Sequence, residues 1–264
     1  MESYLKIYDT LERKIVYDFR LGSGGIGDLT KFFVHLLNIC IDQKIKIHYL
    51  INNIPAEKYL KLCHPKMYIT PETILKSKYH IIQQPSDIAN INNTDYYVVT
   101  PFAFYDSFSF DAITIPLQDV FYFTDEVKRH MILKNEKYIS LHLRMGDKHL
   151  ETDKRFVCCK EDSRTFHEAN IFEFIEKNQD NKTILFLCDN NNYKLKLKSK
   201  YENILITDFD IGHTSFINTT ELQVLNTLKE FYLLSNSEEI YIASYSGFSR
   251  MASKFKNIPI HELY

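Results

Sequence analysis

The sequence predicts an α/β protein built from two doubly wound domains that face each other. β-prone runs alternate with helical stretches along the chain, a pattern typical of parallel sheets covered by helices. The 264 residues suffice for one large domain or two small ones. Each half also opens with a strand that runs into a charged or glycine-rich turn. We place the junction in residues 121–135, where we expect a basic helix, and divide the chain into residues 1–125 and 126–264.

The first half opens with a predicted strand over residues 14–21 that leads into a glycine loop. The loop, residues 22–28, contains four of the seven glycines of the chain. The helix that follows has its apolar residues on one face, and Asp28 is a suitable N-cap. A strand, a glycine loop and a helix N-terminus together form a cradle for an anion or another ligand. Further strands are expected at residues 44–51, 79–83 and 95–100.

The second half opens with a predicted strand over residues 138–143, which alternates and is β-prone. Its end changes abruptly to Arg144, Gly146, Asp147 and Lys148. Ligands of open α/β sheets bind outside the carboxyl ends of strands, and an arginine can bind phosphate through two parallel N–H groups. A solvated charged turn is the alternative interpretation. We expect helices at residues 167–178, 193–201 and 220–235, and a last helix that ends at residue 255. Strands are expected at residues 183–188, 204–207, 239–243 and 258–260.

Two more predicted strands of this half end in polar residues. Asp189 follows the strand 183–188, and the turn Ser246-Gly247-Phe248-Ser249 follows the strand 239–243. Each could simply cap the next helix. If both lie beside Arg144 on one sheet edge, a nucleoside diphosphate fits them. Arg144 would then take one phosphate, Asp189 the ribose or base, and the serine turn the other phosphate.

Composition and charge narrow the class of protein. A net charge of −2 and a pI near 6.6 argue against a general nucleic-acid binder. The five cysteines contain no CxxC pair and the ten histidines no HExxH motif, so we expect neither a disulfide framework nor a structural zinc site. No apolar run approaches the length of a membrane span, and the first residues do not resemble a signal peptide. We therefore expect a cytoplasmic protein whose oligomeric state the sequence does not indicate.

Four motifs resemble those of the fucosyltransferase superfamily, which includes α-1,2-, α-1,6- and protein O-fucosyltransferases. The segment from His142 to Asp147, HLRMGD, looks like the H-x-R-x-G-D motif of that group. The segment from Gly24 to Asp28 resembles its G-G-x-G-N loop, with Asp where Asn is common. The strand ending in Asp189 and the SGFSRMAS turn resemble its nucleoside-binding strand and its C-terminal serine motif. The four matches occur in the order of the family, although the aromatic pair that often follows the serine motif is missing.

The resemblance implies a GT-B fold, with the acceptor on the first domain and the donor on the second. It implies inverting, metal-independent transfer of L-fucose, or a related deoxy sugar, from GDP-fucose to a glycan hydroxyl, with no cofactor besides the donor substrate. A short form without a membrane anchor looks like bacterial or viral members, and a viral one would act in the host cytoplasm. Arg144 and Asp28 are the expected catalytic residues, as diphosphate ligand and general base, with Asp147 and Glu151 as rival bases. The expected donor-binding residues are Gly24, Gly25, Gly27, His142, Arg144, Gly146, Asp147, Asp189, Ser246, Gly247, Phe248 and Ser249.

Other functions stay open at this point. Asp208-Phe209-Asp210 is a DxD sequence of the kind that holds Mn²⁺ in glycosyltransferases that use UDP-sugars. Gly22, Gly24 and Gly27 match the dinucleotide fingerprint GxGxxG, but the next strand ends in Asn52 and Asn53 rather than in the acid that binds the ribose. The chain could also be a non-catalytic module that binds a nucleotide sugar or a glycan. The aromatic segment 102–110 is either a surface on which an acceptor stacks or packing beneath a loop.

Overall fold

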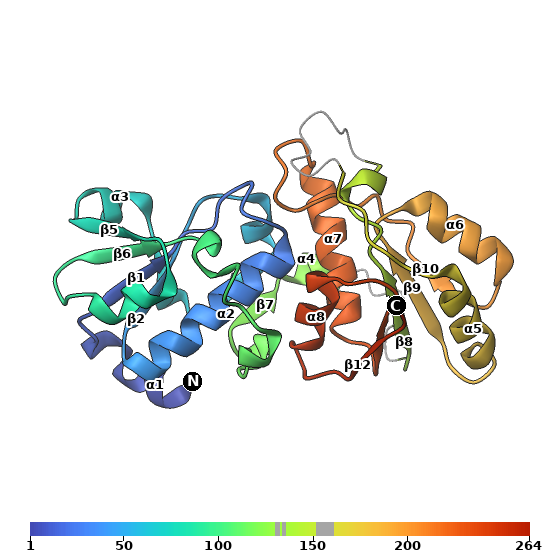
Figure 1. Cartoon of the computed structure of the whole chain (residues 1–264), viewed down its shortest axis with the longest axis horizontal. Coiled ribbons are helices and arrows are strands. Elements are labelled where there is room, and N and C mark those ends of the chain that lie inside the picture. Colours follow the sequence, from blue (N-terminus) through green and yellow to red (C-terminus); the bar gives the residue numbers. More distant parts are fainter. Residues whose placement is uncertain (130–132, 134–135, 152–160) are drawn as a thin grey trace.

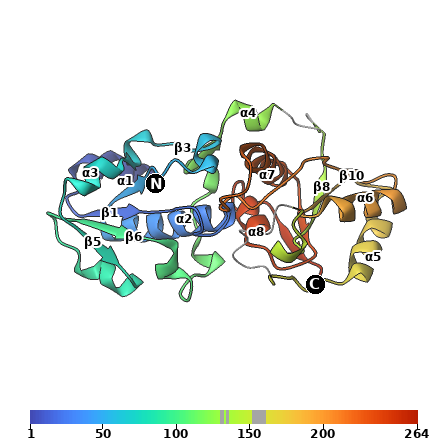
Figure 2. The same ribbon diagram turned by 90° about the horizontal axis from the view of Figure 1, so that it is seen from above.

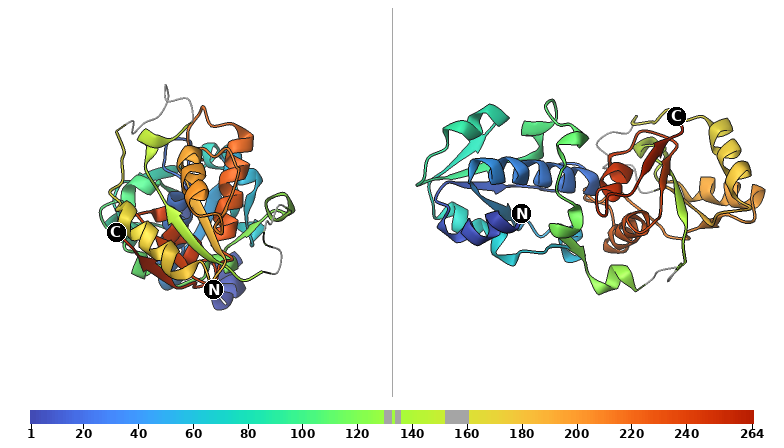
Figure 3. Two further views of the ribbon diagram at one scale, coloured as in Figure 1. Left: turned by 90° about the vertical axis from the view of Figure 1, so that its right-hand side faces the viewer. Right: turned by 90° about the horizontal axis from the view of Figure 1, so that it is seen from below.

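The structure, a computed structural model, describes residues 1–264 apart from 130–132, 134–135 and 152–160. Two five-stranded sheets, each parallel throughout, form two lobes that lie end to end along the long axis (Figures 1 and 3). This arrangement confirms the predicted α/β class. Among the described residues, no helix is long and apolar enough to cross a membrane.

The first sheet has the strand order β4-β2-β1-β6-β5. Its central strand β1 is apolar because helices cover both of its faces, and Val16 and Tyr17 are fully buried. The long helix α2 (Ile26–Gln43) packs Phe33 and Leu37 into this core and directs its N-terminal end at the second lobe (Figure 2). The strands and the other helices of the lobe are β1 (Lys14–Tyr17), β2 (Lys46–Leu50), β4 (Tyr68–Ile69), β5 (Tyr79–Ile82), β6 (Tyr96–Val99), α1 (Glu2–Ile7) and α3 (Pro71–Leu75).

The second sheet has the order β10-β9-β8-β11-β12, with alternate side chains directed to opposite faces. Leu141 and Phe186 pack with α5 and α6 on the outer face, whereas Leu187 and Ile242 pack with α7 and α8 on the face toward the first lobe (Figure 1). The elements are β8 (Ile139–Leu143), β9 (Ile184–Cys188), β10 (Leu205–Ile206), β11 (Ile240–Ile242), β12 (Ile260–Glu262), α5 (Glu168–Asn178), α6 (Asn191–Lys200), α7 (Glu221–Leu234) and α8 (Gly247–Ser253).

The two lobes share one hydrophobic core. The ring of Phe123 lies 4.8 Å from that of Phe255 and 6.1 Å from that of Phe231, between ring centroids. Leu117 donates a backbone hydrogen bond to Lys254 across the same boundary. Phe123 belongs to β7 (Phe121–Phe123), which pairs antiparallel with β3 (Leu60–Leu62) and precedes α4 (Asp125–Lys128). The domain boundary at residue 125 stays a prediction.

Several predicted boundaries were shifted. β1 ends at Tyr17 rather than at residue 21, and residues 18–20 connect it to the turn of the glycine loop. β12 lies at Ile260–Glu262, two residues later than expected. The expected basic helix of residues 121–135 is represented by α4, and residues 130–132 and 134–135 of that prediction lie outside the described part. Short 3₁₀ helices fill the connections at Tyr8–Thr10, Pro55–Lys58, Pro65–Met67, Pro85–Asn90, Pro101–Phe104, Phe110–Ala112, Leu117–Asp119 and Asp147–His149.

Candidate active site

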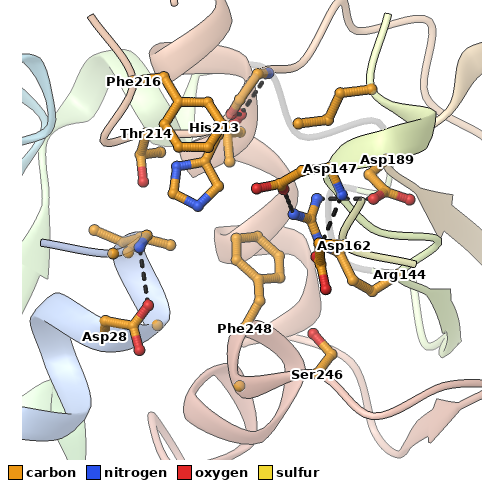
Figure 4. Close-up of a pocket in the computed structure, with 18 of the residues that line it drawn as sticks. Asp28, Arg144, Asp147, Asp162, Asp189, His213, Thr214, Phe216, Ser246 and Phe248 are labelled. Carbon is orange, nitrogen blue, oxygen red and sulfur yellow. Dashed lines mark hydrogen bonds and ion pairs between the residues drawn. The ribbon is translucent and has the colours of Figure 1, made fainter. Parts of the chain in front are cut away.

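A pocket of about 540 Å³ lies between the two lobes, at the end of β8 and at the starts of α2 and α8. Figure 4 shows its walls: the start of α2 on one side, the turn after β8 on the other, and the segment around His213 above Phe248. The expected donor residues that line it are Gly24, Gly25, Gly27, His142, Arg144, Asp147, Asp189, Ser246, Gly247 and Phe248. Asp28 lines it as well, so the structure brings together side chains from all of the predicted motifs.

Arg144 is held among carboxylates at the end of β8. One terminal nitrogen pairs with Asp189 at 2.7 Å, and the other pairs with Asp147. Burial alone would lower the pKa of Arg144, but the carboxylates of Asp189, Asp147 and Asp162 together raise it. The guanidinium has five N–H donors, so these two contacts leave donors for a ligand in the pocket. Arg144 is therefore a charged group in a fixed position, and its binding of an anion stays a prediction.

Asp189 shapes the turn that carries Arg144. Its carboxylate accepts hydrogen bonds from the backbone N–H groups of Met145, at 2.7 Å, and Gly146, at 3.0 Å. The expectation that Asp189 might cap the next helix is wrong, because Asn190 is the N-cap of α6 and accepts from the N–H of Tyr193. A contact of Asp189 with a nucleoside stays a prediction.

Gly146 has a φ of +108°, and a Cβ at this position would lie 2.5 Å from the carbonyl oxygen of Asp162. That close approach brings residues 161–164 against the turn, with Asp162 and Arg164 in the pocket wall. Arg164 pairs with Asp162 at 3.1 Å, and its buried Nε has no hydrogen-bond partner among the described residues. Neither residue is predictable from the sequence, because both lie on an irregular segment with no motif. Burial, together with Asp162 and Asp189, raises the pKa of Asp147 despite its pairing with Arg144.

Asp28 occupies a different place from the one predicted. Gly25 is the N-cap of α2, and Asp28, three residues further on, accepts the Gly25 N–H at 2.9 Å as the second half of a capping box. Its other oxygen pairs with Lys31 at 2.6 Å. The prediction that Asp28 is the N-cap is therefore wrong. The carboxylate still faces the pocket, but both of its oxygens have partners.

The segment around His213 covers the pocket and was not singled out from the sequence. Gly22 donates its N–H to the side chain of Ser215 at 2.7 Å, which ties the glycine loop of the first lobe to this segment of the second. The ring of His213 stacks on Phe216 at 3.9 Å, and its Nδ1 accepts the Ser215 N–H at 3.3 Å. The proton of the neutral imidazole therefore sits on Nε2. Burial, with Arg144 nearby, lowers the pKa of His213 to about 3.

His142 and Phe248 form the opposite side of the pocket. Their rings stack at 5.6 Å, and His142 Nδ1 hydrogen-bonds the hydroxyl of Ser249 at 2.5 Å. Burial lowers the pKa of His142 to about 4, and the positive charges of Arg144 and Lys194 act in the same direction. Two of the expected donor-binding residues, Gly146 and Ser249, do not line the pocket and lie behind its wall. Ser246 does line it and is the N-cap of α8.

A buried ion pair lies beside the pocket. Lys194 and Glu230 are almost fully buried and pair at 2.6 Å, and Lys194 also donates to Thr207 at 2.9 Å. Glu230 lines the pocket as well. A lysine in the Lys-rich helix looks like a surface residue in the sequence, so no pattern predicted this pair.

The remaining predicted candidates lie outside the pocket lining. Asp208 and Asp210 are exposed, and Asp210 accepts a hydrogen bond from Gln223 at 3.1 Å. Glu151 is exposed and accepts from Asn192 at the start of α6. By contrast, Phe102 and Tyr105 of the aromatic segment do line the pocket.

The fold and this pocket define the class of protein: the chain has the GT-B fold, in which two α/β lobes enclose a site at strand ends. No protein-family profile and no curated protein matches the sequence.

Solved fucosyltransferases have the same fold. NodZ α-1,6-fucosyltransferase of Bradyrhizobium, soaked with GDP-fucose, superposes with a TM-score of 0.57 at 12% identity, over 94% of each chain. POFUT1 in complex with GDP-fucose gives 0.57 at 10% identity, over 96% of this chain and 98% of its own. FUT1 of Arabidopsis thaliana in complex with GDP gives 0.56 at 13% identity, over 100% and 75%. At these identities the similarity concerns the fold alone.

Proposed function

We propose that the chain is an inverting glycosyltransferase that transfers L-fucose, or a related deoxy sugar, from a GDP-sugar to a glycan hydroxyl. One observation carries the proposal: Arg144 is fixed at the end of β8 in a pocket that also contains the N-terminus of α2. Structures with the same fold bind GDP-fucose or GDP, which supports this donor class.

Arg144 would stabilise the leaving diphosphate. The bond between the anomeric carbon and the β-phosphate oxygen breaks while the acceptor oxygen attacks from the opposite face, and negative charge builds on the diphosphate. Because Asp189 and Asp147 already orient the guanidinium, no reorganisation is needed when that charge appears. Arg164 lines the same pocket and places a second cation near Arg144.

Asp28 is the proposed acceptor of the proton that the attacking hydroxyl loses. Asp28 faces the pocket from α2, on the side opposite Arg144. An inverting displacement needs the base and the ligand of the leaving group on opposite sides of the sugar. Of the two rival bases, Asp147 is committed to Arg144, and Glu151 binds the start of α6 outside the pocket lining.

The proposal is tested by thermal-shift binding of GDP, GDP-fucose and UDP-glucose, each with and without EDTA. We expect GDP and GDP-fucose to raise the melting temperature regardless of EDTA, since a ligand stabilises the state it binds. Arg144→Lys keeps the charge but loses the paired N–H geometry, so it should reduce the shift and slow transfer by about 10²–10³-fold. Arg129→Lys, at an exposed arginine after α4, is the matched control. A protein that no nucleotide stabilises would refute the proposal.

Two other outcomes would redirect it. Stabilisation by UDP-glucose that EDTA abolishes would indicate a metal-dependent donor site and move the chemistry to Asp208 and Asp210. A non-catalytic binding module is the second candidate, and the engagement of both Asp28 oxygens favours it. That candidate predicts equal GDP affinity for the native chain and for Asp28→Asn, with no sugar transfer or donor hydrolysis by either.

A further inference from the structure

The mouth of the pocket is lined with exposed aromatic rings. Among the described residues, six aromatic side chains are at least two-fifths exposed, and three of the six, Phe102, Tyr105 and Tyr245, line this one pocket. Phe102 is 64% exposed and Tyr245 49%. We call these three residues the aromatic rim. Exposed aromatic surface collected at one site marks a binding surface rather than ordinary surface scatter.

The rim is built from both lobes. Phe102 and Tyr105 come from the 3₁₀ helix Pro101–Phe104 and the residue after it, and their ring centroids lie 5.8 Å apart. Tyr245 comes from the turn between β11 and α8 in the second lobe. Because these rings and Arg144 line the same pocket, a molecule on the rim would share the pocket with a donor bound at Arg144.

Cations lie over two of the three rim rings, Tyr105 and Tyr245. Lys31 Nζ lies 5.5 Å from the ring centroid of Tyr105, and the guanidinium of Arg250 lies 5.3 Å from that of Tyr245 and 5.4 Å from that of Phe110. Such cation–π contacts fix the orientation of a ring before a ligand arrives, which reduces the ordering cost of binding. The carboxylate of Asp28 and the ammonium of Lys31 lie in the same wall and can bind hydroxyl groups.

We propose that the aromatic rim is a carbohydrate-binding subsite, on which a pyranose ring of the acceptor stacks while its hydroxyls reach Asp28 and Lys31. A pyranose offers an apolar C–H face and a periphery of hydroxyls, which this combination of rings and charges complements. A peptide bound by strand addition would need a free sheet edge. Among the described residues, β8 is the strand at the pocket, and it is the central strand of its sheet.

That the bound carbohydrate is the acceptor of a transfer reaction rests on the proposed function. The binding of a carbohydrate to the rim does not, so the two can be tested separately. We would titrate the full chain, with GDP present, against an array of immobilised oligosaccharides built from hexoses and N-acetylhexosamines, with immobilised peptides alongside. The variants are Phe102→Ala and Tyr245→Ala. Tyr122→Ala removes an equally exposed tyrosine of β7 outside the pocket lining and is the matched control. Thermal shift with GDP is measured for every variant.

We expect the native chain to bind a subset of the oligosaccharides, and each rim variant to bind them roughly tenfold more weakly, the loss typical of one aromatic stacking contact. Tyr122→Ala should bind as the native chain does, and all variants should keep the GDP shift. Binding of no oligosaccharide, binding of peptides alone, or unchanged binding by both rim variants would overturn the subsite. Oligosaccharide binding that the rim variants lose, without any GDP shift, would support the rim and refute the proposed donor.

Discussion

Burial keeps the imidazole of His142 neutral in the folded protein, and this couples stability to pH. Its pKa falls from 6.5 to about 4 on folding, so between these values the unfolded chain binds the extra proton and the folded chain does not. Stability should therefore fall as the pH drops through this window, by roughly 3 kcal/mol for this one residue. Urea unfolding of the native chain at neutral and mildly acidic pH measures the loss.

His142→Gln should flatten that pH dependence even if the variant is less stable at neutral pH. His167→Gln, at an exposed histidine before α5, should leave the dependence as steep as in the native chain. Because burial also lowers the pKa of His213 and His48, part of the slope will remain in His142→Gln. An unchanged slope in His142→Gln would show that this residue is not the source of the coupling.

Gly24 can be tested as the residue that allows the capping box to form. Its φ is +112°, and a Cβ there would lie 2.3 Å from the Asp28 carboxylate that caps α2. Gly24→Ala should therefore add a clash to the backbone strain and cost roughly 1–3 kcal/mol. Gly22→Ala is the matched control, since Gly22 has a φ of +88° and open space around its Cβ position. Equal destabilisation of the two variants, measured by urea unfolding, would contradict the clash.

Single residues of the site were predictable from the sequence where a local pattern indicated them. The change from an apolar strand to Arg144, and the cluster of glycines before α2, both follow from short-range sequence. The hydrogen-bond partners of Arg144 do not follow from short-range sequence. Asp189 is 45 positions from Arg144 and lies beside it because β8 pairs with β9. His213 and Arg164 lie on irregular segments without periodicity, so only the folded chain shows that they line the pocket.

At the level of elements, α2 and α8 meet at their N-termini, and the contact depends on Gly27. A Cβ on Gly27 would lie 3.0 Å from both the carbonyl carbon of Gly247 and the N–H of Phe248, which are backbone atoms with little freedom to move. Gly27→Ala should lower the free energy of unfolding by roughly 1–3 kcal/mol and widen the pocket mouth.

The opposite side of this contact supplies the control. A Cβ on Gly247 would lie 4.0 Å from its nearest neighbour, Cζ of Phe110, so Gly247→Ala should be close to neutral for stability. Urea unfolding of both variants makes the comparison, and equal stability of the two would disprove tight packing between the helix starts. That these segments form helices was predictable from the spacing of their apolar residues. The first residue of α2 was not predictable, because the helix is capped jointly by Gly25 and Asp28, whereas the sequence pattern indicated Asp28 as the cap.

For the whole molecule, the continuous core predicts that the two lobes unfold together. Phe231 of α7 is fully buried and packs against Phe123 of β7, so the helix layer of the second sheet is also the interface with the first lobe. Burying apolar surface across the boundary couples the stabilities of the two sheets, since neither lobe can lose its structure without exposing the other's core. We therefore expect the two predicted domains to unfold as one cooperative unit.

Phe231→Ala tests this coupling. The substitution should cost roughly 3–5 kcal/mol through lost burial and the cavity it leaves. If the lobes are coupled, hydrogen exchange followed by mass spectrometry will show β1 and β8 losing protection together, and calorimetry will show a single transition at a lower temperature. Tyr122→Ala, at an exposed residue of the same β7 strand, should change neither measurement. Loss of protection in β8 while β1 stays protected would mean that the lobes fold independently despite their shared core.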